Sequence, residues 1–134
     1  MSTPVAVVSA DAGKLLLRLA LGILVLMHGL AKVGSGPADI VSVAEKVGLP
    51  GSFAYAVYLG EVVAPIALIV GVWTRLAALV VAINMAVAVA LAHMGELLSR
   101  NESGGWALEL QGMFLFTALA IALIGPGRYA MTRI

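Results

Sequence analysis

Cysteine is absent from the chain. This absence excludes structural disulfides, thiolate metal sites, iron–sulfur clusters and a redox-active CxxC pair within the chain. Charge is also scarce, because only 11% of the residues are Asp, Glu, Lys or Arg. No basic run exists to bind a phosphate backbone, so nucleic acid is not an expected partner. If the protein takes part in redox chemistry, the electrons must travel on something other than its own sulfur.

Apolar residues, in contrast, make up 62% of the 134 residues, and the mean hydropathy is +1.08. Soluble domains are about half apolar and about one quarter charged. A soluble domain of this length also has too small an interior to bury so much apolar surface. The sequence therefore predicts an integral membrane protein, formed by one domain over residues 1–134.

Four apolar segments are long enough to cross a bilayer as helices, which takes about 20 residues. They cover approximately residues 15–33, 54–73, 76–94 and 108–124. Helices are expected because lipid offers no partner to unpaired backbone groups, and because the segments lack the alternation of barrel strands. The predicted fold is all-α, a transmembrane four-helix bundle.

The remaining segments carry two further predictions. Residues 40–47 place apolar side chains at a helical spacing and predict a short amphipathic helix at the membrane surface, in the first outer loop. Residues 1–12 are expected to form a short mobile leader rather than a secretory signal, because they have no cationic start and no cleavage site follows. A four-residue repeat of small side chains in the third helix predicts close helix packing. Its members are Ala78, Ala82, Ala86 and Ala90.

The distribution of basic residues predicts the orientation in the membrane. One side of the bundle collects Lys14, Arg18, Arg75, Arg128 and Arg133. The other side collects only Lys32, Lys46 and Arg100. Because basic residues concentrate on the cytoplasmic side, both termini are predicted to be cytoplasmic. The arginines Arg18, Arg75 and Arg128 are expected to contact anionic headgroups, with pairing to a neighbouring helix end as an alternative for Arg18.

Several ionisable side chains are predicted to lie in the outer half of the bundle. A rise of about 1.5 Å per residue places them at a similar depth on four different helices. They are His28, Lys32, Glu61, His93 and Glu109. Each needs an explanation, since an ionisable group inside a membrane costs at least about 2.5 kcal/mol on insertion scales.

The functional interpretation is a polar pocket that opens to the outer side. Glu61 and His28 are the candidates for proton handling, because a carboxylate beside an imidazole can pass protons to or from a quinone. The candidate binding residues are Lys32, Asn84, His93, Glu109 and Trp106, of which the last is also an interfacial anchor. No phosphate loop, nucleophile elbow or Ser–His–Asp grouping is present.

Three alternatives remain open for the same residues. Glu61 and Lys32 can form a buried pair that only fixes helix packing, or Lys32 can extend to the headgroups. His28 and His93 can ligate a haem. A metal site is the third alternative, with the ligand set His28, His93, Glu61 and Glu109.

Several short motifs resemble the DoxX family of small four-helix membrane proteins. They are Arg18-Leu-Ala-Leu-Gly, His28-Gly-Leu-Ala-Lys32, Val47-Gly-Leu-Pro50, Glu61, Thr74-Arg75-Leu-Ala-Ala, Asn84-Met85, His93, Gly104-Gly-Trp and Gly125-Pro-Gly-Arg-Tyr129. The resemblance spans residues 15–129. The family often has two glycines shortly after the helix-two glutamate, where this chain has Ala64-Pro65, and this difference predicts a differently kinked backbone near Glu61.

The resemblance implies a membrane subunit of a redox or stress-response complex. Members or relatives resemble subunits of thiosulfate:quinone oxidoreductase, and others are associated with assemblies that contain superoxide dismutase and a sulfurtransferase. The expected ligand is a quinone or a sulfur-containing small molecule, and the expected partners are lipid, redox enzymes and further copies of the chain. The expected location is the bacterial cytoplasmic (inner) membrane. The alternatives are a non-catalytic anchor or assembly protein and a small transporter or metal handler.

Overall fold

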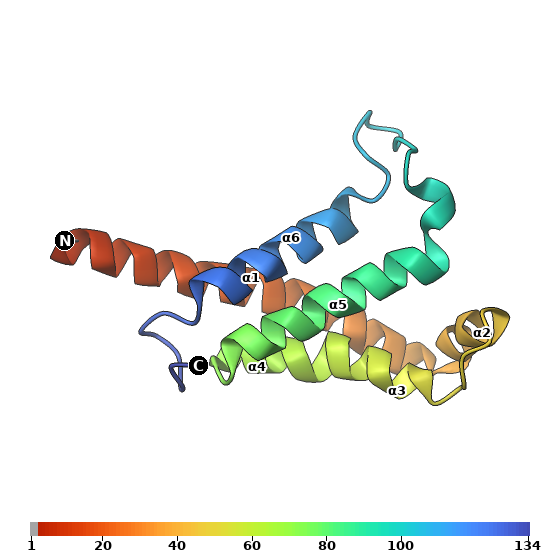
Figure 1. Cartoon of the computed structure of the whole chain (residues 1–134), viewed down its shortest axis with the longest axis horizontal. Helices are drawn as coiled ribbons and strands as arrows, with labels where there is room; N and C mark the ends of the chain where they lie inside the picture. The colour runs from red at the N-terminus through yellow and green to blue at the C-terminus, as the bar shows by residue number, and fades with distance from the viewer. Residues whose placement is uncertain (1–2) are drawn as a thin grey trace.

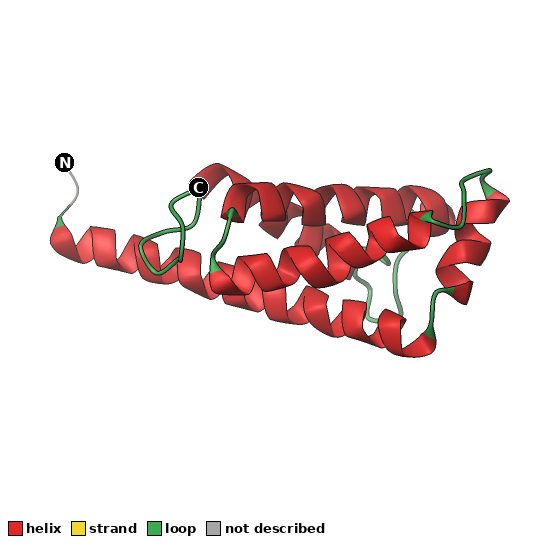
Figure 2. Cartoon of the chain, turned by 90° about the horizontal axis from the view of Figure 1, so that it is seen from below, coloured by secondary structure: helices red, strands yellow, loops and turns green. Residues whose placement is uncertain are grey.

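The computed structural model describes residues 3–134, and the regular elements in that part of the chain are helical. In chain order they are α1 (Pro4–Ser35), α2 (Ala38–Lys46), α3 (Phe53–Tyr58), η1 (Leu59–Val63), α4 (Ala64–Val70), α5 (Thr74–Ala92), η2 (Met94–Glu96) and α6 (Glu109–Ile124). Because α3, η1 and α4 follow one another without a break, they form one composite rod. This rod packs with α1, α5 and α6 as a bundle, and α2 lies at one end (Figures 1 and 2). The predicted all-α bundle with a short helix in the first connection is confirmed.

Three segments are long and apolar enough to cross a membrane, namely Pro4–Ser35, Phe53–Val70 and Thr74–Leu91. The fourth predicted span is present as α6, but its 16 residues cover only about 24 Å, less than the ~30 Å of a typical hydrocarbon core. Large apolar side chains are exposed on the helices of the bundle, for example Ile83 on α5 and Phe116 on α6. Such exposure is expected for a bundle whose surroundings are lipid.

The first helix begins earlier than predicted. The prediction of a mobile leader over residues 1–12 is wrong for residues 4–12, which are helical; the first two residues lie outside the described part of the chain. Thr3 caps the helix by accepting a hydrogen bond from the Ala6 N–H at 3.1 Å, and Pro4 occupies the first turn, where its missing N–H is tolerated. The prediction followed the apolar run and overlooked this cap. The N-terminal turns of α1 project beyond the rest of the bundle (Figure 1).

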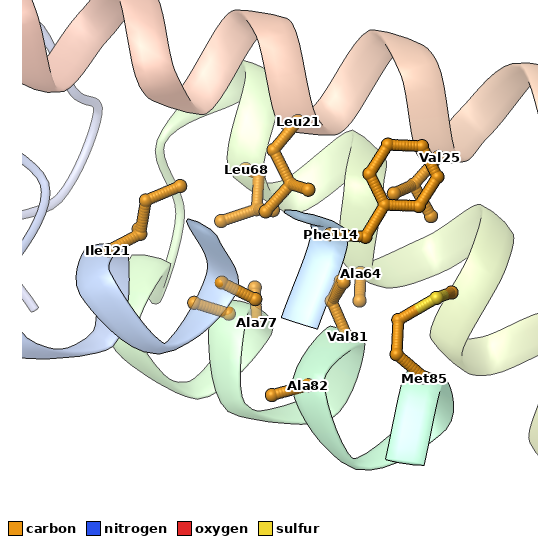
Figure 3. Packing of buried hydrophobic residues seen from close by; sticks show 12 residues of the cluster. Leu21, Val25, Ala64, Leu68, Ala77, Val81, Ala82, Met85, Phe114 and Ile121 are labelled. Atoms are coloured by element: carbon orange, nitrogen blue, oxygen red, sulfur yellow. The ribbon is translucent and has the colours of Figure 1, made fainter. Parts of the chain in front are cut away.

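The apolar core extends from the middle of the bundle towards the chain termini. Figure 3 shows its side chains packing together from α1, the composite rod, α5 and α6. They include Leu21, Leu68, Val81, Met85, Phe114 and Ile121. Of the predicted stripe of small residues, Ala78 and Ala82 are buried in this core, whereas Ala86 and Ala90 are exposed. The stripe therefore packs against neighbouring rods over its first half only.

Two glycines allow α1 to approach the composite rod closely. A Cβ atom at Gly22 would lie 3.0 Å from the Pro65 carbonyl oxygen, and one at Gly29 would overlap the Glu61 carbonyl oxygen. Small residues are typical where membrane helices pack backbone against backbone. Gly29 thus brings α1 directly onto the turn that carries Glu61.

Both chain termini lie at one end of the bundle, which we call the terminal end and define by residues 71–73 and 125–134 (Figure 2). The opposite end, defined by α2 and residues 93–108, is the loop end. After α6 the chain folds back over the turn between α4 and α5. The Thr74 N–H donates to the Ile134 carbonyl at 2.8 Å, and the Thr132 N–H donates to the Gly71 carbonyl at 3.0 Å. The C-terminal tail is therefore part of the folded bundle.

Candidate functional site

Glu61 lies in η1, a single π-helical turn inside the composite rod. Pro65, four residues further on, has no N–H to donate to the Glu61 carbonyl. The N–H of Ala64, which in an α-helix would donate to the carbonyl four residues earlier, donates to the Leu59 carbonyl, five residues earlier. This pairing widens the turn. The unusual backbone predicted near Ala64-Pro65 is therefore a π turn. Turns of this kind occur frequently at functional sites.

The Glu61 side chain is buried and binds two other side chains through one of its oxygens. Lys32 Nζ lies 2.7 Å from Glu61 Oε1, and Asn84 Nδ2 donates to the same oxygen at 3.2 Å. Asn84 packs tightly here, because a Cβ atom at Gly60 would lie 2.7 Å from its Cγ. The contacts join α1, η1 and α5. The second oxygen, Oε2, is buried without a hydrogen-bond partner among the described residues. Buried polar atoms without a partner are rare in proteins and need an explanation. Oε2 is the atom at which this carboxylate can hold a proton or accept a hydrogen bond from a ligand.

A cavity of about 310 Å³ lies beside this carboxylate. The polar side chains that line it are Lys32, Ser35, Asp39, Glu61, Asn84 and His93. Its other walls are apolar and include Ile40 and Val43 of α2, Val57 of α3 and Leu91 of α5. A volume near 300 Å³ with apolar walls and a few convergent polar groups is at the lower limit for small-molecule sites.

A second cavity, of about 80 Å³, shares Lys32, Glu61 and His93 with the first. His28 also lines it, and its ring meets Phe114 edge to face, with centroids 5.7 Å apart and an interplanar angle of 75°. The predicted site residues that line one or both cavities are His28, Lys32, Glu61, Asn84 and His93. The structure thus places candidate proton carriers and hydrogen-bond donors around one carboxylate.

Two predicted binding residues do not reach the site. Glu109 Oε1 accepts a hydrogen bond from Asn101 Nδ2 at 2.9 Å, and Trp106 Nε1 donates to the Leu97 carbonyl at 2.7 Å. Neither residue lines either cavity, and both instead order the loop end. The prediction used depth alone, and depth does not specify which face of a helix points inward.

The metal and haem sites that remained open as alternatives are not supported by the geometry. Among residues 3–134, no three His, Asp or Glu side chains gather in a way that could hold a metal ion. His93 Nδ1 lies 3.3 Å from Glu96 Oε1, and Glu109 is turned towards the loop. His28 and His93 do share a cavity, but its volume of about 80 Å³ is far smaller than a porphyrin.

Sequence reasoning also missed part of the site. It placed residues 40–47 at the membrane surface and did not assign Asp39, Ile40 or Val43 to the pocket. The available signal was the apolar face of α2, which required a partner; Ala44 is fully buried, whereas Val47 is half exposed. Gln111 of α6 lines the smaller cavity, and a neutral amide carries no charge that would have identified it from sequence.

At the terminal end, Arg18 forms a second buried polar centre. Its Nε donates to the Leu68 carbonyl at 3.0 Å, and its Nη2 donates to the Ile69 carbonyl at 3.2 Å. Its Nη1 donates to the carbonyls of Pro126 at 3.1 Å and Tyr129 at 3.2 Å. The two α4 carbonyls belong to the last turn, where intrahelical partners are missing. Arg18 therefore caps a neighbouring helix and fixes the tail, and it is too deeply buried to serve as the headgroup contact first expected of it.

The other two arginines assigned to headgroups are exposed at the same end. Arg75 lies in the first turn of α5, and Arg128 lies in the tail with its guanidinium 5.8 Å from the centre of the Tyr129 ring. Headgroup contact by these two side chains remains a prediction.

Residues 13–94 match the sequence model of a known family, described as DoxX. The match covers more than half of the chain and includes α5, the composite rod and nearly all of α1 that packs in the bundle. The five site residues that line the cavities all lie within the matched range. No curated protein and no solved structure matches the chain.

Proposed function

We propose that this protein, which belongs to the DoxX family, is a membrane subunit of a redox or stress-response assembly and binds a quinone or a sulfur-containing small molecule beside Glu61. Membership of the family supports the general role. The specific ligand class is supported by one observation above the others. Glu61 is 2% exposed, has one oxygen without a hydrogen-bond partner among residues 3–134, and borders a cavity with apolar walls.

A quinone ring matches the chemistry of this cavity. The ring is flat and apolar, and its two carbonyl oxygens require hydrogen-bond donors. Lys32 Nζ and Asn84 Nδ2 are donors at the cavity wall, while Ile40 and Val43 offer apolar contact. A sulfur oxyanion would use the same Lys32 ammonium as its counter-charge. In both cases Glu61 lies at the reacting end of the ligand.

Reduction of a quinone to a quinol consumes two electrons and two protons. The chain has no cysteine to supply electrons, so a partner oxidoreductase would deliver both. Protons would pass through Glu61 Oε2 and through His28 or His93, since imidazole groups exchange protons near neutral pH. The role of this chain is therefore to hold the ligand and to supply its protons.

Ligand binding to the protein in lipid nanodiscs tests the proposal. The probes are a short-chain quinone and thiosulfate, and the variants are Glu61→Gln and the control Glu109→Gln. The control removes a carboxylate of similar predicted depth that lies outside both cavities. One probe should bind the wild type, and Glu61→Gln should weaken it about tenfold or more, as expected for loss of a charge-assisted hydrogen bond. Absence of binding by both probes, or equal weakening by both variants, would contradict the proposal.

A non-catalytic anchor is the second candidate, and one observation favours it. Glu61 joins α1, η1 and α5 through Lys32 and Asn84, which is also what a packing device would do. In that case Glu61→Gln would lower the unfolding temperature, and neither probe would bind the wild type. Measuring thermal unfolding and ligand binding on the same samples separates the two functions.

We also propose that the terminal end faces the cytoplasm of a bacterial inner membrane. Five Lys and Arg residues lie at the terminal end or in the helix turns next to it, and three lie at the loop end or in the helix turns next to it. A C-terminal green fluorescent protein should therefore fluoresce, and a C-terminal alkaline phosphatase should be inactive. The opposite pair of results would reverse the orientation.

A further inference from the structure

Another cavity, separate from the two beside Glu61 and about 760 Å³ in volume, lies at the terminal end. It is bounded by the N-terminal part of α1, the first turn of α5 and the tail. Its basic side chains come from all three of these parts, and they are Lys14, Arg75, Arg128 and Arg133. Asp11 is the acidic side chain in the lining, and its Oδ1 accepts the backbone N–H of Arg128 at 3.3 Å. We call this feature the terminal cavity.

The positive charge of the terminal cavity is balanced only in part within the described chain, because Asp11 is the one acidic side chain in its lining. The ion pairs found among residues 3–134 join Lys32 to Glu61 and His93 to Glu96, away from the terminal end. None of the four basic side chains of the terminal cavity has an acidic group within 4.0 Å in that part of the chain. Several charges of one sign around a single hollow produce a local potential that attracts anions.

The tail holds these charges in place. Gly125 and Gly127 have φ angles of +83° and +78°, which glycine adopts readily, and they turn the tail between α1 and α5. A Cβ atom at Gly127 would lie 3.2 Å from the Cβ of Lys14, and one at Gly125 would lie 2.7 Å from Nη2 of Arg75. Arg18 also holds this turn, because its Nη1 donates to the tail carbonyls of Pro126 and Tyr129. The packed tail therefore fixes the backbone positions from which its basic side chains extend, next to those of α1 and α5.

The surroundings of the terminal cavity distinguish a lipid from a free anion. Val7, Ile124 and Met131 also line it, and all three are exposed apolar side chains. A free phosphate would gain nothing from them, whereas the glycerol and upper acyl carbons of a lipid would cover them. Arg75 stands in the first turn of a membrane-spanning helix, which is the depth of the headgroups.

We propose that the terminal cavity binds the phosphate-bearing headgroup of an anionic phospholipid. Arginine is well suited to this role because its planar guanidinium binds two phosphate oxygens at once. Four basic side chains opposite one acid favour a headgroup with two phosphates over a headgroup with one. Basic pockets at membrane-helix ends are a recognised way to hold such lipids.

Native mass spectrometry of the purified full-length protein tests this site. The lipids are diphosphatidylglycerol, phosphatidylglycerol and phosphatidylcholine, each added separately in detergent. The test variant is Arg75→Gln with Arg128→Gln, and the control is Lys46→Gln with Arg100→Gln, which removes the same charge from exposed positions at the loop end. A second test variant, Lys14→Gln with Arg133→Gln, covers the case in which the first does not fold.

Diphosphatidylglycerol should bind the wild type most tightly and phosphatidylcholine least. The folded test variant should lose about tenfold or more in affinity for diphosphatidylglycerol, while the control should change by less than about twofold. Equal losses in test and control would overturn the proposal, because they would indicate general charge attraction. Full competition by millimolar inorganic phosphate would also overturn it, since the site would then take a free anion and not a lipid.

Discussion

Arg18 and Glu61 are both buried charged side chains, but they differ in how completely their hydrogen-bonding capacity is used. Arg18 is 1% exposed, and each of its three guanidinium nitrogens donates to a backbone carbonyl. Glu61 is 2% exposed, yet both of its partners bind one oxygen and the other oxygen has none in the described chain. Arg18 uses four of its five N–H groups and lines none of the cavities described above, whereas Glu61 keeps a free oxygen beside a cavity.

The surroundings of the two groups differ in the same way. The partners of Arg18 are backbone carbonyls of α4 and the tail. The partners of Glu61 are side chains, and its cavities hold room for another molecule. A buried charge whose partners are backbone carbonyls fixes a structure, and one with a free oxygen beside a cavity is available for binding. The first is therefore expected to govern stability, and the second is the candidate for the ligand binding proposed above.

The largest expected effect is on stability, from Arg18→Met. The substitution leaves several buried carbonyls without donors, and each such group is worth about 1–3 kcal/mol, so unfolding should become easier by about 3 kcal/mol or more. Thermal unfolding in detergent measures the change. Arg128→Met, at an exposed position of the same end, is the control and should change stability by less than about 0.5 kcal/mol. Similar losses in the two variants would remove the distinction between Arg18 and a surface arginine.

The next effect comes from Gly29→Ala, which tests the packing beneath Glu61. The added Cβ overlaps the Glu61 carbonyl oxygen, so α1 must move away and stability should fall by about 1–3 kcal/mol. Gly34→Ala is the matched control, because it lies on the same helix with no atom near the added Cβ. Thermal unfolding of the pair gives the result. If Gly29→Ala is as stable as Gly34→Ala, α1 does not contact η1 as closely as described.

Glu61→Gln should have a smaller effect on stability than either. It keeps the shape of the side chain and the Asn84 contact, and it weakens an ion pair whose lysine side chain is 40% exposed. The expected loss is therefore about 1 kcal/mol or less. Thermal unfolding in the same detergent allows direct comparison with Arg18→Met. A loss as large as that of Arg18→Met would show that the two centres are equally structural.

The smallest expected effect on global stability is that of Thr3→Ala. Removing the cap should destabilise the first turns of α1 by about 1 kcal/mol, without changing the global unfolding temperature. The projecting turns lie outside the packed core, so their loss should remain local. Hydrogen exchange of the amides in residues 5–12 measures this, and Thr3→Ser should restore protection. A lower global unfolding temperature would show that these turns support the bundle.

Hydropathy and composition were sufficient to predict the helices of the bundle and α2, because apolar length and helical spacing are local properties of the chain. That Glu61, Lys32, His28 and His93 lie at a common level of the bundle was also predictable, since the level follows from counting residues along a helix, and all four line one cavity. The direction in which a side chain points around the helix axis was not predictable in this way. Glu109 and Trp106 have a suitable depth and still face the loop, because the course of the chain between α5 and α6 determines their direction.

The tertiary structure alone decided how the buried charges are satisfied. Arg18 lies far in sequence from Leu68 and Tyr129, and only the packing of α4 and of the tail against α1 brings their carbonyls to it. The position of Asn84 against Glu61 likewise depends on close contact at Gly60. Lipid exposure, span length and the presence of ionisable residues are written in the sequence, residue by residue. Contacts between distant segments decide which of those residues is paired with the backbone and which keeps a free oxygen, and no local pattern in the sequence records these contacts.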